Sequence, residues 1–158
     1  MLNKVYPGEE LTFDDVYFTC FMIEKIARAR HLQNFEVINK IPRDDLYELV
    51  SCAQVYHCMD DDMLAAEWIE KYGIPTGDFQ FDNVIPEFNV TIPTDLQIGK
   101  VFAYIIIPVA NNRPDGDIIQ TMYDVYNSPI TLKINDYNTS AFYEPDYVQI
   151  RAFYDGHF

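Results

Sequence analysis

The sequence is short of positive charge. Its 158 residues include 11 Lys and Arg against 25 Asp and Glu, which gives a formal net charge of −14 at pH 7. The excess is spread along the chain: 15 acidic and seven basic residues lie up to residue 79, with 10 and four beyond it. A protein that binds nucleic acid needs a cationic face, and an anionic membrane repels a protein of net negative charge. We therefore expect neither direct nucleic-acid binding nor membrane binding.

Cysteine, glycine and catalytic motifs are also scarce. The three cysteines are an odd number, and Met1–Glu10 lacks the apolar core of a secretory signal. These features predict free thiols in the cytoplasm of a bacterial or phage-infected host. The six glycines form no phosphate-binding loop or nucleophile elbow, so we predict no catalytic residue and no cofactor. The longest apolar run, near Val101–Ala110, is too short to span a bilayer.

Helical spacing of apolar residues fills the first half of the chain. A stripe runs from Phe13 to about Arg30, and Thr12 with Asp15 forms a capping box before it. Asp60 is the expected N-cap of the fourth helix. The three helices predicted after the first cover residues 34–40, 43–59 and 61–72.

Proline and glycine interrupt the pattern in residues 73–93, and β-branched and aromatic runs follow. Val101–Ile107 is apolar nearly throughout, as in a strand covered on both faces. A short helix is expected after Asp117. Strands are predicted at residues 88–92, 96–109, 130–134 and 147–154.

These elements predict an α+β fold. About four N-terminal helices would pack on a small, mainly antiparallel C-terminal sheet that includes one short helix. The predicted division is a helical subdomain at residues 1–79 and a β-rich subdomain at 80–158, together forming one cooperative unit.

Acidic residues gather at the fourth predicted helix. Their simplest interpretation is a cap and a favourable interaction with the helix dipole. Caps do not require a net charge of −14, however, and an unbalanced negative field attracts basic grooves on other proteins. We therefore predict that this cluster binds a partner; its members are Asp60, Asp61, Asp62, Glu67 and Glu70.

His57 precedes the same cluster and offers an alternative. On a continuous helix it would face Asp60 and Asp61, which is a possible geometry for a divalent metal. No second His or Glu-x-x-His pair lies on the neighbouring predicted helices, so we predict no metal site. Cys58 follows His57 directly, and adjacent helical residues do not face each other.

Tyrosine is abundant, with seven of its 12 residues in the second half. Residues 135–147 mix tyrosine with Asn, Ser, Asp and Glu, a composition typical of a binding surface. A hairpin with half-buried rings is the alternative. The partner-binding residues predicted here are Tyr137, Tyr143, Glu144 and Tyr147.

Composition and size, rather than any motif, predict a non-enzymatic inhibitor. Its acidic surface would occupy a basic nucleic-acid-binding surface of a protein partner, such as an effector or nuclease, and so mimic DNA. Such proteins are expected in phages and mobile elements as anti-defence factors, including anti-CRISPR inhibitors. Two alternatives stay open: a small enzyme or ligand-binding domain near His57 and Asp60–Asp62, and an antitoxin-like partner of a basic toxin. A homodimer also stays open.

Overall fold

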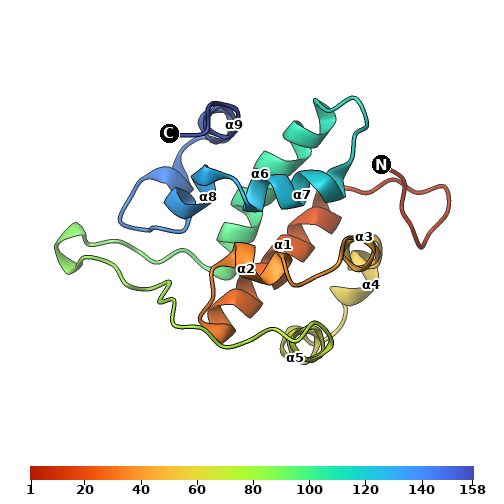
Figure 1. Cartoon of the computed structure of the whole chain (residues 1–158), viewed down its shortest axis with the longest axis horizontal. Coiled ribbons are helices and arrows are strands. Elements are labelled where there is room, and N and C mark those ends of the chain that lie inside the picture. Colours follow the sequence, from red (N-terminus) through yellow and green to blue (C-terminus); the bar gives the residue numbers. More distant parts are fainter.

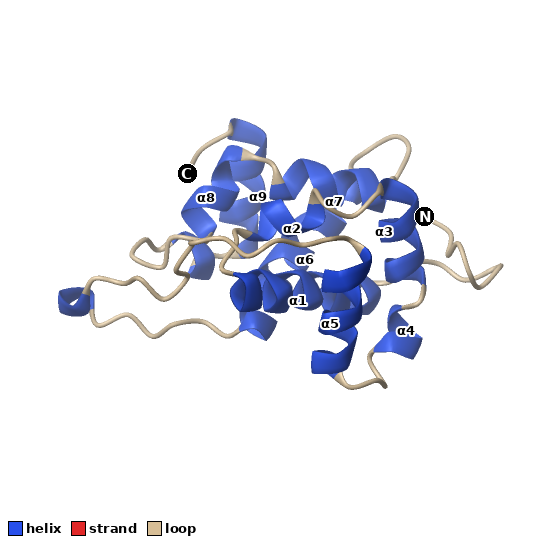
Figure 2. Ribbon diagram, turned by 60° about the horizontal axis from the view of Figure 1, so that its bottom comes forward, coloured by secondary structure: helices blue, strands red, loops and turns tan.

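The computed structural model describes residues 1–158 and contains no β-sheet (Figures 1 and 2). The predicted α+β fold, with its β-rich C-terminal half, is therefore wrong: the protein is all-helical. Its β pairing is limited to one isolated bridge between Leu2 and Glu10. The α-helices are α1 (Phe13–Arg30), α2 (Asn34–Ile38), α3 (Arg43–Ser51), α4 (Ala53–Tyr56), α5 (Asp61–Lys71), α6 (Asp95–Asn111), α7 (Ile118–Tyr126), α8 (Pro129–Ile134) and α9 (Asp146–Asp155), and the 3-10 turns are η1 (Pro86–Phe88) and η2 (Ala141–Tyr143).

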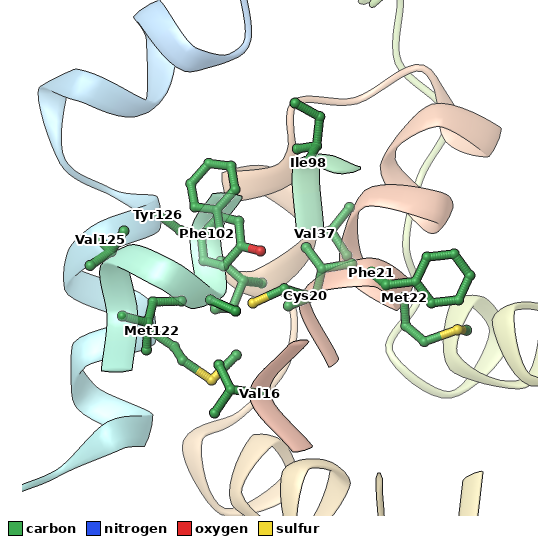
Figure 3. Packing of buried hydrophobic residues seen from close by; sticks show 14 of the residues in the cluster. Val16, Cys20, Phe21, Met22, Val37, Ile98, Phe102, Met122, Val125 and Tyr126 are labelled. Atoms are coloured by element: carbon green, nitrogen blue, oxygen red, sulfur yellow. The ribbon is translucent and has the colours of Figure 1, made fainter. Parts of the chain in front are cut away.

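Helices α1 and α6 pack against each other at the centre, and the shorter helices surround them (Figures 1 and 2). A Cβ atom on Gly99 of α6 would lie 2.7 Å from the Phe21 backbone nitrogen of α1. Glycine at this position therefore permits the close approach of the two helices. Nearby, the rings of Phe102 and Tyr126 stack with centroids 4.3 Å apart (Figure 3). One cluster of 36 buried residues includes both halves of the chain.

Residues 96–109, predicted as a strand, belong to helix α6. A capping box fixes its start: the Gln97 backbone N–H donates to Thr94 Oγ1 at 3.1 Å, and the Thr94 N–H donates to Gln97 Oε1 at 2.8 Å. Because α6 is buried on most sides, its apolar residues form a continuous run that resembles a buried strand. The packing of α6 against α1 overrides the β-propensity of its isoleucines.

The other three predicted strands are also absent. Residues 130–134 lie in α8, which has Pro129 in its first turn, where the missing N–H costs no helical hydrogen bond. Residues 147–154 lie in α9, and Gly156 ends that helix with φ +82°. Residues 88–92 lie at the end of η1 and in the extended chain before α6. Helices this short have apolar patterns that fit a strand equally well.

The predicted helices of the first half are close to the structure. The capping box of Thr12 and Asp15 opens α1, Asp60 caps α5, and Asp117 caps α7. The helix expected at residues 43–59 is instead two helices, α3 and α4, because the backbone leaves helical geometry at Cys52. None of the helices combines the length and apolar character that a bilayer crossing requires.

Candidate functional site

The predicted acidic cluster lies at the start of α5 and on its exposed face. Asp60 caps the helix, because its Oδ1 accepts a hydrogen bond from the Met63 backbone N–H at 2.9 Å. Asp62 accepts from Lys25 Nζ at 2.8 Å, an ion pair between an exposed carboxylate and a half-buried lysine. Glu67 and Glu70 are exposed one and two turns further along, and neither makes an ion pair. Capping of the helix thus explains the presence of Asp60, whereas most of the cluster faces solvent.

The start of α5 lies beside the starts of α1 and α6. Residues from all three helix starts line one open groove, namely Asp14, Asp61 and Leu96. Lys25 lies near carboxylates at the starts of α5 and α6. The pKa of Lys25 is raised by the hydrogen bond to Asp62 and by the nearby charges of Asp62, Asp95 and Asp61. One lysine therefore faces carboxylates from two helix starts.

The groove has an apolar floor and a volume of about 780 Å³. The floor consists of the rings of Tyr17, Phe18 and Phe21 on α1. Gln54 and His57 form the opposite wall, where α4 ends. No Lys or Arg side chain lines it. The groove therefore offers aromatic contact area below and negative charge at its edge.

Helix dipoles do not cancel this charge. Each helix N-terminus contributes a partial charge of roughly +0.5, so three contribute less than two full positive charges. The first turns of α1, α5 and α6, with the cap of α5, hold six carboxylates in return: Asp14, Asp15, Asp60, Asp61, Asp62 and Asp95. Only Asp62 of these makes an ion pair. The region around the groove is therefore net negative.

His57 lies in the same groove, and no hydrogen bond or ion pair joins its ring to a carboxylate. Its two ring nitrogens are each 3.8 Å from Cys58 Sγ, and no other side chain hydrogen-bonds to the ring. No group of three His, Cys, Asp or Glu side chains is placed to hold a metal ion. Cys20 is buried, and burial raises the pKa of its thiol to about 12, so it does not act as a nucleophile at neutral pH.

The tyrosine-rich segment lies beside a different hollow, of about 720 Å³, which has no charged side chain in its lining. Tyr143 and Tyr147 are exposed by 68% and 69%. Glu144 is half-buried and accepts a hydrogen bond from Ser140 Oγ at 2.8 Å. Tyr137 differs, because it is only 3% exposed. The structure thus separates Tyr137 from the exposed tyrosines with which the sequence grouped it.

Tyr137 belongs to a buried polar network behind that hollow. Its hydroxyl accepts a hydrogen bond from Arg28 Nη2 at 3.0 Å, and Arg28 Nε donates to Glu24 Oε1 at 3.0 Å. Arg28 also donates to the Pro93 carbonyl, and Asn34 donates to Glu24. Burial raises the pKa of Glu24, although Arg28 and Asn34 act in the opposite direction. In this network the Tyr137 hydroxyl contacts Arg28 and Glu24, and the side chain of Tyr137 also lines the hollow.

Sequence reasoning identified only His57 and Asp61 among the groove residues and missed the other nine, which include Asp14, Tyr17, Phe18 and Leu96. The capping signals at Thr12 and Asp60 marked two of the three helix starts. The third is marked by Thr94 and Gln97, but Gln97 lay within a predicted strand and Thr94 just before it. Comparison of the chain with protein-family models, with curated proteins and with solved structures finds no match. The function must therefore be argued from this groove and its charges.

Proposed function

We propose that the chain is a non-enzymatic binding protein that occupies a basic, nucleic-acid-binding surface of a protein partner. The observation that supports this most is the groove between the starts of α1, α5 and α6, which combines carboxylates at its edge with an aromatic floor and no cation in its lining. A basic partner surface would gain both charge complementarity and apolar contact there.

The surface charges support the same proposal. Only seven of the 25 acidic side chains make an ion pair. Exposed carboxylates without a cation repel one another, which stabilises neither the fold nor self-association. They become favourable when a basic partner approaches. A nucleic-acid-binding effector or nuclease fits this chemistry, and so does a basic toxin whose antitoxin this chain would be.

The test is capture of the partner from a lysate of the native host, followed by displacement with DNA. The immobilised chain should retain a basic protein at low salt, and both salt and double-stranded DNA should release it. Surface charges are screened over about 8 Å at physiological ionic strength, so the salt dependence should be steep. Release by DNA would show that the partner surface also binds nucleic acid, as the proposal requires.

Charge variants connect this binding to the proposed surface. Changing Asp61 and Asp62 to Asn, and Glu67 and Glu70 to Gln, removes four charges while keeping the Asp60 cap. Retention should fall by at least about tenfold, mainly through slower association. The control changes Asp146 and Asp155 of α9 to Asn, on another side of the molecule (Figure 1). Equal retention by the four-charge variant and the wild type would contradict the proposed surface, and retention that DNA leaves unchanged would contradict the nucleic-acid-binding partner.

A further inference from the structure

The acidic groove has a shape as well as a charge. Helix α1 supplies its aromatic floor and one acidic residue: Asp14, Tyr17, Phe18 and Phe21 lie on one face of the helix at positions i, i+3, i+4 and i+7. Seven residues of helix rise by about 10 Å, the length of two helical turns. The opposite side is formed by the short helix α4, by His57 directly after it and by the start of α5. The groove is therefore a trough between helices, two turns long.

We infer that this trough takes an amphipathic, basic helix of the protein partner. A helix that enters a groove lays its apolar side chains on the floor, one turn apart, and keeps its polar flanks at the edges. Here the floor offers aromatic rings, and the edges offer Asp14 and Asp61. Lys or Arg residues on the flanks of the entering helix would meet those two carboxylates.

Neither edge carboxylate has an ion-pair partner within the chain. Lys25, the lysine near them, is engaged by Asp62. Leu96, beside the trough, is 48% exposed, so an apolar side chain is available for contact at the start of α6. A basic amphipathic helix would satisfy the charges and cover the leucine at once.

A second copy of this chain is a poor occupant. Two chains of net charge −14 repel each other, and five of the 11 Lys and Arg side chains are already paired with acids of the same chain. The inference rests on the proposed function, because it assumes a basic partner, but it adds that the partner contributes a helix with an apolar face.

Two labelled peptides of equal composition test the trough. Both contain 14 residues of Leu and Lys. In one, Leu follows helical spacing so that a single apolar face forms, and in the other the same residues are shuffled. A third peptide has the helical pattern with Glu in place of Lys. Fluorescence anisotropy with the full chain should show binding of the patterned Lys peptide, about tenfold weaker binding of the shuffled one, and none of the Glu peptide.

A variant that fills the trough provides the second measurement. Gln54 is exposed and lines the trough, so Gln54→Trp places a large side chain there without removing a charge or a core contact. It should lower the affinity for the patterned peptide to that for the shuffled one. The matched control is Val55→Trp, because Val55 is the next residue of α4, is 49% exposed and does not line the trough.

Equal affinity for the patterned and shuffled peptides would overturn the inference, since attraction of charge alone would explain both. Undiminished binding of the patterned peptide by Gln54→Trp would overturn it as well. Sedimentation that shows a dimer of the chain, dissociated by Gln54→Trp, would assign the trough to a second copy instead. None of these results affects the DNA-sensitive capture of a partner, so they would leave the proposed function intact. Conversely, a failed capture would contradict the proposed function, and the peptide measurements would still report separately on the trough.

Discussion

Two hollows lie on either side of the first turns of α6, and their chemistry differs. Leu96 lines the acidic groove, whereas Gln97, Ile98 and Val101 line the neutral hollow. Their volumes are similar, about 780 and 720 Å³. One has aspartates and no cation in its lining, and the other has no charged side chain. A net charge of −14 therefore does not describe every surface of the molecule, and six of the 25 acidic residues lie where α1, α5 and α6 begin.

The two hollows also differ in what supports them. Behind the neutral hollow lies the buried ion pair of Arg28 and Glu24, with side-chain exposures of 14% and 6%. Around the acidic groove the carboxylates other than the buried Asp15 are exposed or half-buried, and only Asp62 makes an ion pair. Substitutions behind the neutral hollow should therefore change stability, and substitutions at the acidic groove should change binding. The predictions below test this separation, beginning with the largest expected loss of stability.

Arg28→Met should destabilise the fold most, by about 3–5 kcal/mol at neutral pH, because it leaves Glu24 buried without its cation. It also removes the hydrogen bond to Pro93 and the stacking on the Phe81 ring, whose centroid is 4.3 Å from Cζ. The control is Arg151→Met, which changes an exposed arginine of α9. Denaturant unfolding monitored by circular dichroism measures both. A loss below about 1 kcal/mol would mean that the ion pair does not support this side of the molecule.

The destabilisation by Arg28→Met should also depend on pH. Burial raises the pKa of Glu24 above its ordinary value of 4.5, so the folded chain binds its proton more tightly than the unfolded chain does. Stability from this group is therefore fully present below pH 4.5 and is lost as the pH rises through the raised pKa. Without Arg28, this loss of stability at higher pH is larger. The difference in stability between wild type and variant should shrink on acidification, and a difference that stays constant with pH would contradict this account.

Gly99→Ala should come next, with a loss of about 2–3 kcal/mol from overpacking. Helix propensity alone would predict a gain of about 1 kcal/mol, so the sign of the change is decisive. The added Cβ would lie 2.8 Å from the Phe21 Cα, and a backbone atom cannot move aside. Because residues of α6 line both hollows, this variant should weaken peptide binding at the groove and should also lower the stability of the fold. Lys100→Ala, at the exposed neighbouring position, should stay within about 0.5 kcal/mol of the wild type.

Asp60→Ala should cost about 1 kcal/mol, because it removes the side-chain cap on the Met63 N–H. Asp60→Asn should recover most of that stability, since Asn also caps well. Unfolding of the two variants under the same conditions measures the difference. If Asp60→Ala instead lowers partner capture as strongly as the four-charge variant does and leaves stability unchanged, Asp60 is a contact residue and its capping role is unimportant.

The sequence predicts local features of this molecule better than its spatial arrangement. Caps at Thr12, Asp60 and Asp117 combine a side-chain acceptor with helical spacing, and each lies where it was expected. Helix α6 was missed because burial on most sides removes the polar positions that would reveal a period of 3.6 residues. The capping box of Thr94 and Gln97 was a signal that could have corrected the assignment.

The groove was out of reach for a different reason. Asp14, Asp61 and Leu96 are far apart in the sequence, and only the packing of α1, α5 and α6 brings them together. Without α6 as a helix, no pattern connects these positions. The grouping of Tyr137 with Tyr143 failed to anticipate burial for a related reason, because the partners of Tyr137 are Arg28 and Glu24, more than 100 residues away in the chain.

The smallest effect on stability is expected from Asp14→Asn combined with Asp61→Asn. Each change removes a favourable interaction with a helix N-terminus, of about 0.3–1 kcal/mol at most, and also relieves repulsion from the neighbouring carboxylates. The two terms oppose each other, so stability should stay within about 0.5 kcal/mol of the wild type. Binding of the patterned Lys peptide should nevertheless weaken by at least about tenfold, because both edge charges of the groove are gone.

Asp146→Asn with Asp155→Asn changes the net charge equally on α9 and should leave peptide binding nearly intact. Equal weakening by the two pairs would show that only the total charge matters, and the distinction between the acidic groove and the rest of the surface would be lost.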